Sequence, residues 1–151
     1  MVSINYSRGI CLIRFFVFLA VILLVFSSET FADDREKALT TEPGRSSEGK
    51  KVFNDRDKGH CLLCHRFSRS DESFQGTIGP SLDGIATKLD AQQIRYRIID
   101  NSRLNSQTLM PAYFRTEGLV QVAAEFKGKT VLSAQDVEDL VAYLVLDRKG
   151  R

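Results

Sequence analysis

The residues with the clearest chemical potential lie within six consecutive positions. His60, Cys61, Cys64 and His65 are the only histidines and cysteines after Cys11. From Cys61 onward the chain reads C-L-L-C-H, the C-x-x-C-H spacing typical of covalent haem c attachment. The spacing suits this chemistry because two thiols one helical turn apart can form thioethers with the two vinyl groups. The imidazole of His65 then lies beneath the iron, where it serves as an axial ligand.

Three other interpretations use the same residues. A structural zinc site needs four Cys or His ligands, and four ligands crowded into six positions can hardly form a tetrahedron. A thioredoxin-like redox pair needs a βαβ context, and the sequence has no such strand pattern. A local disulfide between Cys61 and Cys64 stays open, although it leaves His65 and the long loops unexplained. We therefore favour one covalently bound haem c.

Met110 is the predicted second axial ligand. It is the only methionine after residue 32, and Pro111 forces it out of the helical region and into a loop. A lone methionine more often fills a gap in a core, but a helical domain this small has little core. A thioether is also a usual partner of histidine in electron-transfer haem proteins. His60 is too close to Cys61 to reach the opposite face of the haem.

With both axial positions filled, the iron should transfer electrons rather than bind substrate. A metal-bound imidazole also needs an acceptor for its other ring N–H. The loop at Gly79 and Pro80 offers a backbone carbonyl for His65.

The elements that must position these residues are short helices separated by long loops. The first helix is capped by Ser46 or Ser47 and ends before Lys58. A second begins at the Asp90 cap, with Gln93 three residues later, and stops at residues 100–101. A third begins at Ser133, with Asp136 in its first turn, and ends at residues 148–150. Its apolar stripe comprises Val137, Leu140, Val141, Leu144 and Val145.

Residues 66–83 and 102–116 lack a helical or alternating pattern and are predicted loops. Between residues 119 and 132 we expect a short helix through Ala124 and a strand-like segment at 130–132. The chain is therefore predicted to be a small all-α domain of three or more helices with long loops.

The N-terminus has the layout of a secretory signal peptide. Arg8 and Arg14 precede an apolar run over residues 15–26, and the small-residue pattern ending at Ala32 suits cleavage there. An uncleaved anchor is the alternative, but a membrane span needs ~20 apolar residues. We expect a leader over residues 1–32, a flexible lead-in over 33–45 and one domain over 46–151, exported and free of the membrane.

The net charge and the expected export of the chain limit which partners it can bind and which state its cysteines can adopt. Cleavage removes two basic residues and one acidic residue, so the net charge of +2 falls to about +1. A near-neutral chain argues against nucleic acid as a partner. Because an exported protein meets an oxidising environment, Cys61 and Cys64 should be paired or otherwise committed.

The residues resemble class I cytochromes c over nearly all of the chain after the leader. Gly49 and Phe53 on the first helix, and Leu140 and Tyr143 on the last, have the spacing of that family's crossed terminal helices. The G-P-S-L run at residues 79–82 is similar to the family's histidine-side loop. The resemblance implies helices wrapped around one covalent haem, with the Pro80 carbonyl accepting from the haem histidine.

A narrower resemblance is to the SoxX-like cytochromes, the monohaem subunits of SoxAX complexes of bacterial sulfur oxidation. This resemblance rests on several short motifs that occur in the same order and spacing. They are G-P-S-L at 79–82, R-I-I-D at 97–100, Asn105, M-P-A-Y at 110–113 and the segment 128–144. It implies a periplasmic heterodimer with a SoxA-like cytochrome. That complex joins thiosulfate to a cysteine of a SoxYZ-like carrier protein, an L-cysteine S-thiosulfotransferase activity. This chain would accept the electrons, without substrate catalysis of its own, and pass them to another cytochrome.

The number of cysteines agrees with a chain that accepts electrons while the sulfur chemistry takes place on a partner. Once both thiols are bonded to haem, no sulfur nucleophile remains, so the sulfur–sulfur chemistry must take place on a partner. The alternative is a freestanding monohaem carrier, which would usually show a charged patch for transient docking. A haem-based ligand sensor would need an open sixth position, and Met110 argues against it.

Overall fold

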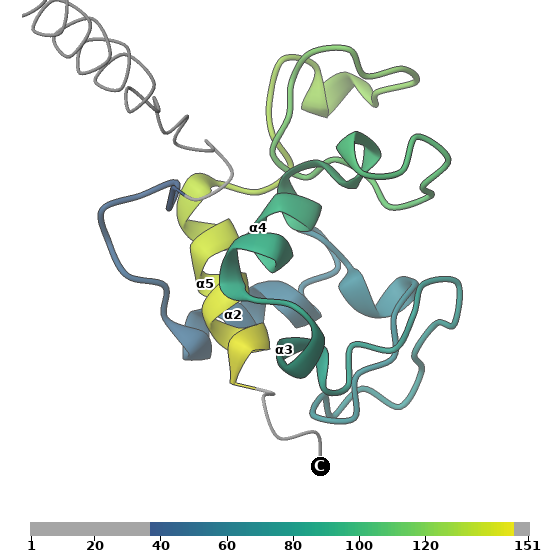
Figure 1. Cartoon of the computed structure of the whole chain (residues 1–151). Helices are drawn as coiled ribbons and strands as arrows, with labels where there is room; N and C mark the ends of the chain where they lie inside the picture. The colour runs from purple at the N-terminus through teal and green to yellow at the C-terminus, as the bar shows by residue number, and fades with distance from the viewer. Residues whose placement is uncertain (1–36, 147–151) are drawn as a thin grey trace, which may run out of the picture. The chain divides into compact units, whose positions relative to one another are not determined.

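The computed structural model describes residues 37–146, which form short helices joined by long loops (Figure 1). Within this range the α-helices are α2 (Ser46–Asn54), α3 (Ile85–Lys88), α4 (Ala91–Asp100) and α5 (Ala134–Val145), and 3₁₀ turns span Cys61–Leu63, Asn101–Arg103 and Ala124–Phe126. No strand occurs among these residues, and the predicted all-α fold is confirmed. None of the described helices is long and apolar enough to cross a membrane. The predicted leader, residues 1–32, lies outside the described range.

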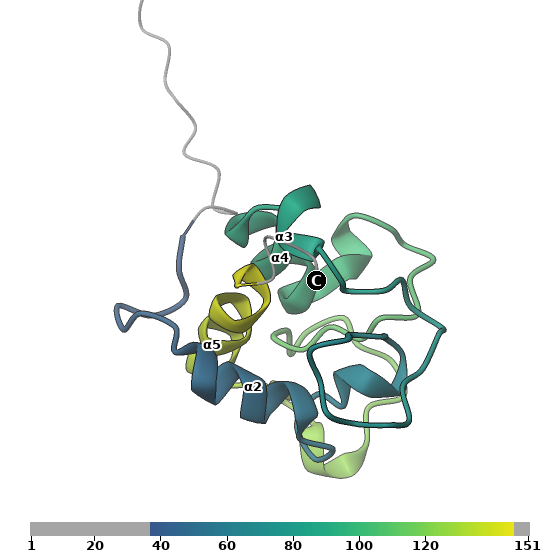
Figure 2. The ribbon, with the colours of Figure 1, turned by 90° about the horizontal axis from the view of Figure 1, so that it is seen from below.

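α2 and α5 cross and pack closely against each other at one side of the domain (Figure 2). Gly49 permits this approach, because a Cβ atom there would collide with the backbone carbonyl of Asp139 in α5. The rings of Phe53, Phe67 and Tyr143 meet beside this contact, with centroids 5.3 to 5.7 Å apart. Tilted and edge-to-face arrangements at this separation are favourable for aromatic rings. The two helices therefore form a rigid frame at one side of the domain.

α5 begins where the sequence predicts. Ser133 accepts a hydrogen bond from the backbone N–H of Asp136, whose carboxylate accepts from the backbone N–H of Ser133 at 3.0 Å. This reciprocal cap satisfies two backbone donors that the helix leaves unpaired. The predicted stripe is buried at Val137, Leu140, Val141 and Leu144, and partly buried at Val145. The predicted end at residues 148–150 lies outside the described residues.

α4 also follows its sequence signals. Asp90 and Gln93 form the predicted capping box, the helix ends at Asp100, and Ile94 and Ile98 are buried. Arg95 on this helix forms a buried, two-bond ion pair with Glu138 of α5, with both N···O distances at 2.7 Å. The pair joins the two helices directly.

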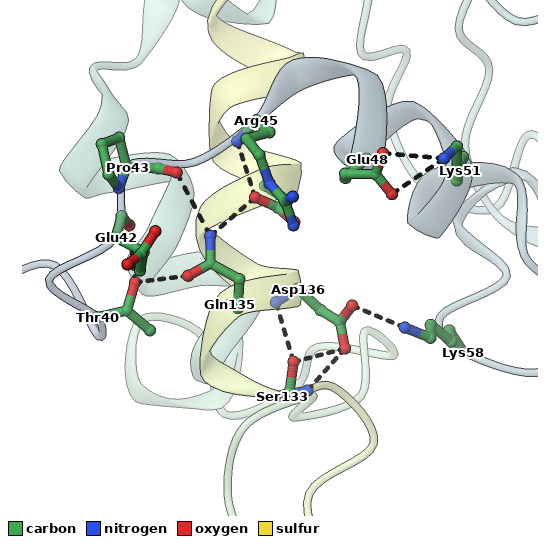
Figure 3. A network of polar contacts seen from close by, with 11 residues as sticks. Thr40, Glu42, Pro43, Arg45, Glu48, Lys51, Lys58, Ser133, Gln135 and Asp136 are labelled. Carbon is green, nitrogen blue, oxygen red and sulfur yellow. Dashed lines mark hydrogen bonds and ion pairs between the residues drawn. The ribbon is translucent and has the colours of Figure 1, made fainter.

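The predicted serine cap of α2 is wrong. Arg45 is the N-cap residue, and no side chain caps the helix. The backbone N–H of Arg45 instead donates to Asp139 of α5 at 2.8 Å, and Thr40 donates to Gln135 of α5 at 3.0 Å (Figure 3). These acceptors lie more than ninety positions along the chain, so no local pattern could reveal them. Thr40 and Arg45 of the predicted lead-in are thus hydrogen-bonded to α5.

The segment from residue 119 to residue 132 follows the prediction in part. The expected short helix is the 3₁₀ turn Ala124–Phe126, but the expected strand at 130–132 is wrong. Leu132 is buried and donates one backbone hydrogen bond to Tyr113 at 3.1 Å. A single bond is no strand ladder, so the apolar residues here reflect core packing. The four-residue α3 is an element that the sequence analysis did not predict.

Candidate functional site

A largely apolar cavity of about 440 Å³ brings the predicted site residues together. Cys61, Cys64, His65 and Met110 all line it, although 45 positions separate His65 from Met110. Pro80 lines it too. The volume lies in the range of pockets that bind organic cofactors. His60, which the sequence analysis set aside as a ligand, is not among the described residues that line it.

The C-x-x-C-H segment forms one tight turn at this cavity. The 3₁₀ turn Cys61–Leu63 buries Leu62, and the backbone N–H of His65 donates to the carbonyl of Cys61 at 2.9 Å. His60 precedes the turn with a φ of 43°. Residues other than glycine rarely adopt this left-handed conformation, and such strain gathers at functional sites. The turn places both thiols and the imidazole at the same cavity wall.

The orientation of His65 is set by a backbone acceptor. Its Nδ1 lies 2.7 Å from the carbonyl oxygen of Pro80. Because a carbonyl can only accept, Nδ1 carries the proton and Nε2 keeps its lone pair. This is the tautomer that a metal-ligating histidine needs when Nε2 is the ligand. The predicted carbonyl at the Gly79–Pro80 loop is therefore within hydrogen-bond distance of His65.

Two glycines let this loop approach the turn. A Cβ atom at Gly79 would collide with the His65 ring, and one at Gly76 would collide with the carbonyl of Leu63. The loop is fixed by hydrogen bonds from Gly79 N to Cys64 O and from Gly76 N to Leu62 O, both 2.8 Å. Only a residue without a side chain can bring the backbone this close.

Met110 is held in place through its neighbour Thr108. The backbone N–H of Met110 donates to Thr108 Oγ1 at 3.2 Å, and Asn101 Nδ2 donates to the same oxygen at 2.8 Å. Asn101 directly follows α4, so the helix end is linked to the methionine. Asn101 and Thr108 were not predicted as site residues, because hydrogen bonds between loop residues leave no periodic signal in the sequence.

Tyr113 is a further cavity residue. Its hydroxyl donates to the carbonyl of Gly59 at 2.9 Å, which ties the chain after Met110 to the chain before Cys61. Burial, with a smaller contribution from the nearby Cys61 and Cys64 thiols, raises the pKa of Tyr113 well above its ordinary value. The hydroxyl therefore stays protonated and remains a donor at physiological pH.

The cysteines do not resemble a reactive redox pair. Burial raises the pKa of the Cys61 thiol to about 12, whereas redox-active C-x-x-C pairs have a lowered thiol pKa. Cys61 and Cys64 are not joined by a disulfide. Among residues 37–146, no group of three or more Cys, His, Asp or Glu side chains is placed to hold a metal ion by itself.

The residues at the cavity fit a covalent haem c. Two thiols within one turn, an imidazole in the ligating tautomer and a thioether from a separate loop form the donor set. The walls are mostly carbon, as a macrocycle requires. A group of polar side chains occupies part of the lining: Arg97, Asn101, Asn105, Gln107 and Thr108.

Comparisons with known proteins agree with this geometry. The family model for cytochrome c matches residues 46–146. A chain in the crystal structure of SoxXA from P. pantotrophus is 33% identical, with a TM-score of 0.69. The match covers 76% of this chain and 89% of that chain. No curated protein sequence matches.

Proposed function

The chain belongs to the cytochrome c family, and from this premise we propose that it is the electron-accepting, monohaem subunit of a SoxAX-type complex. Members of the family bind haem c covalently, and Cys61 and Cys64 fit the attachment motif. The observation that carries the proposal is the meeting of Cys61, Cys64, His65 and Met110 at one apolar cavity. The similarity to a SoxXA chain supports the choice of complex.

Each site residue has a proposed role. Cys61 and Cys64 would form the thioethers, and His65 would bind the iron through Nε2. The Pro80 carbonyl accepts the Nδ1 proton of His65 and keeps that nitrogen from competing. Met110 would supply the second protein ligand to the iron. A haem iron held by histidine and methionine supplies one-electron transfer at a raised reduction potential.

The sulfur chemistry then takes place on partners. Joining thiosulfate to a cysteine thiol forms one sulfur–sulfur bond and releases two electrons and one proton. With Cys61 and Cys64 committed to haem, residues 33–151 have no thiol left to attack. One haem holds one electron, so a SoxA-like subunit or two successive transfers must handle the pair. We place the reaction in the periplasm, on a cysteine of a SoxYZ-like carrier, with a second cytochrome as the downstream acceptor.

Affinity purification of the tagged protein from its native host, grown on thiosulfate, tests this function. We expect a second cytochrome in stoichiometric amount and haem reduction when thiosulfate and the carrier protein are added together. Omitting the carrier is the control and should leave the haem oxidised. A lone cytochrome that thiosulfate and carrier cannot reduce would instead identify a freestanding monohaem carrier.

A further inference from the structure

The loop that carries Met110 is closed at its base by an ion pair. Asp100 is the last residue of α4 and is fully buried. Its Oδ2 lies 2.8 Å from Nη1 of Arg115, where the chain returns after the methionine. Residues 100–115 therefore leave α4 and come back to its end within fifteen positions.

Further contacts strengthen this closure. Ser102 donates to Asp100 Oδ1 through its backbone N–H at 3.0 Å and through its hydroxyl, and Arg115 Nη1 lies 3.4 Å from the same hydroxyl. Two backbone hydrogen bonds lie beside the pair, from Tyr113 N to Ile98 O at 3.3 Å and from Phe114 N to Ile99 O at 3.2 Å. Backbone and side-chain contacts together close the loop at this point.

The charges at this closure are stable at neutral pH. Burial opposes ionisation of Asp100, but the hydrogen bonds from Ser102 and the charges of Arg115 and Arg103 outweigh it, and the net pKa lies below the ordinary value. Arg103 is 3.3 Å from Asp100 on a half-exposed side chain, where an ion pair is weak. Arg115 is more buried, with 28% of its side chain exposed. The pair with Arg115 is thus the main link.

A short path connects this ion pair to the methionine. Asn101 follows Asp100 directly and donates to Thr108, which accepts from the backbone N–H of Met110. If the loop opens at its base, Asn101 moves with the helix while Thr108 and Met110 move with the loop. The bond at 2.8 Å between Asn101 and Thr108 is then lost.

We propose that Asp100 and Arg115 are positioning residues for Met110: their ion pair closes the loop and holds the methionine at the haem cavity. The inference rests on the proposed role of Met110 as a ligand. Neither residue lines the cavity, so neither contacts the haem site directly. Opening the loop exposes the sixth coordination position to outside ligands.

The test uses the full-length, haem-loaded protein with Asp100→Asn. The amide keeps the size of the side chain and removes its charge. We measure the reduction potential, the long-wavelength absorption band of the methionine–iron bond, and the Kd of the oxidised protein for imidazole. If the open-loop fraction rises about tenfold, the apparent Kd for imidazole falls about tenfold, and the band weakens. Loss of the Asp100 charge by itself favours the reduced haem and opposes the fall in potential from weaker methionine ligation, so the Kd and the band decide the test.

Two comparisons separate positioning from general stability. Glu138→Gln breaks the Arg95–Glu138 pair, which is also buried and also starts on α4 but does not touch the loop. It should lower the melting temperature and leave the imidazole Kd unchanged. Arg115→Lys keeps the charge and should give a smaller change in Kd than Arg115→Gln.

Equal imidazole Kd values for Asp100→Asn, Glu138→Gln and the unmodified protein would overturn the inference. If Asp100→Asn does not accumulate with haem, Arg115→Gln and Ser102→Ala serve in its place, and an unchanged Kd in both is equally decisive. Met110→Ala is the reference for the ligand itself. An unchanged potential in that variant removes the proposed ligand role, whereas a lowered potential there with no effect of Asp100→Asn removes the positioning role alone.

Discussion

Single residues at this site act through close contacts that leave no spare volume. Gly79 lies against the His65 ring while the next residue, Pro80, accepts the Nδ1 proton at 2.7 Å. The same short stretch thus presses on the imidazole and hydrogen-bonds to it. A change of one methyl group here should alter the proposed iron ligand directly.

Gly79→Ala should displace the loop or the His65 ring and break the bond to Pro80. We expect a loss of stability of about 1–3 kcal/mol, typical for overpacking, and a lower yield of haem-loaded protein. Thermal melting and the haem-to-protein ratio measure both. Gly59→Ala is the matched control at the same site, because its Cβ would make ordinary contacts, 3.5 Å from Cys61 Sγ and 3.6 Å from Tyr113. Equal losses in the two variants would contradict this steric argument.

Met110→Ala should keep the covalent haem, open the iron and lower the reduction potential, because thioether ligation raises it. Redox titration and imidazole binding measure the change. Leu104→Ala is the control, since Leu104 is an exposed residue of the same loop and is not among the residues that line the cavity. A potential that moves as much in Leu104→Ala as in Met110→Ala would point to the loop rather than the ligand.

The site residues that could be predicted from the sequence are those with a distinctive side-chain type or those that lie next to one another in the chain. Cys61, Cys64 and His65 are contiguous, and Met110 is the only methionine after residue 32. Asn101 and Arg115 were missed because their partners, Thr108 and Asp100, are brought close only by the folding of residues 100–115. An asparagine or arginine in a loop has many ordinary explanations, so nothing in its type singles it out.

At the scale of elements, local signals and distant contacts determine different helix ends. The capping boxes at Asp90 and Ser133 join residues three positions apart, so they can be read directly from the sequence. The start of α2 depends on Asp139 of α5 instead. Two serines at 46 and 47 suggest a cap that the backbone does not use. α3 has four residues, too few for any periodic pattern to appear.

This difference predicts unequal effects of two similar substitutions. Ser133→Ala removes the hydroxyl that accepts from Asp136 N at 3.1 Å and should cost about 1 kcal/mol of stability. Ser47→Ala removes a hydroxyl from an exposed residue that caps nothing and should change stability by less than about 0.5 kcal/mol. Denaturant midpoints at constant slope compare the two. A loss in Ser47→Ala as large as that in Ser133→Ala would contradict the assigned helix start.

At the scale of the whole domain, the helices and the N-terminal segment are joined by carboxylates of α5. Glu138 binds Arg95 of α4 and also accepts from the backbone N–H of Leu39 at 2.9 Å. Asp139 accepts from Arg45 N, and Asp136 lies 2.7 Å from Lys58 Nζ. Three acidic residues on one helix therefore hold segments that precede it by up to about a hundred positions. The contacts of Glu138 with Arg95 and of Asp136 with Lys58 are ion pairs, which need an ionised carboxylate.

This arrangement makes the domain sensitive to acid. Burial opposes ionisation of Asp100, Asp136 and Glu138, but hydrogen bonds and nearby cations outweigh it and lower each pKa. Because the folded pKa values lie below those of the unfolded chain, the stabilisation is complete above the ordinary values of about 4 and is lost as the pH falls through the lowered values. We expect a free energy of unfolding that is flat from about pH 7 to 5 and declines below about pH 4. Denaturant unfolding of the haem-loaded protein across this range measures it. Glu138→Gln should be less stable at neutral pH and should show a shallower decline, whereas an identical decline would place the acid sensitivity elsewhere.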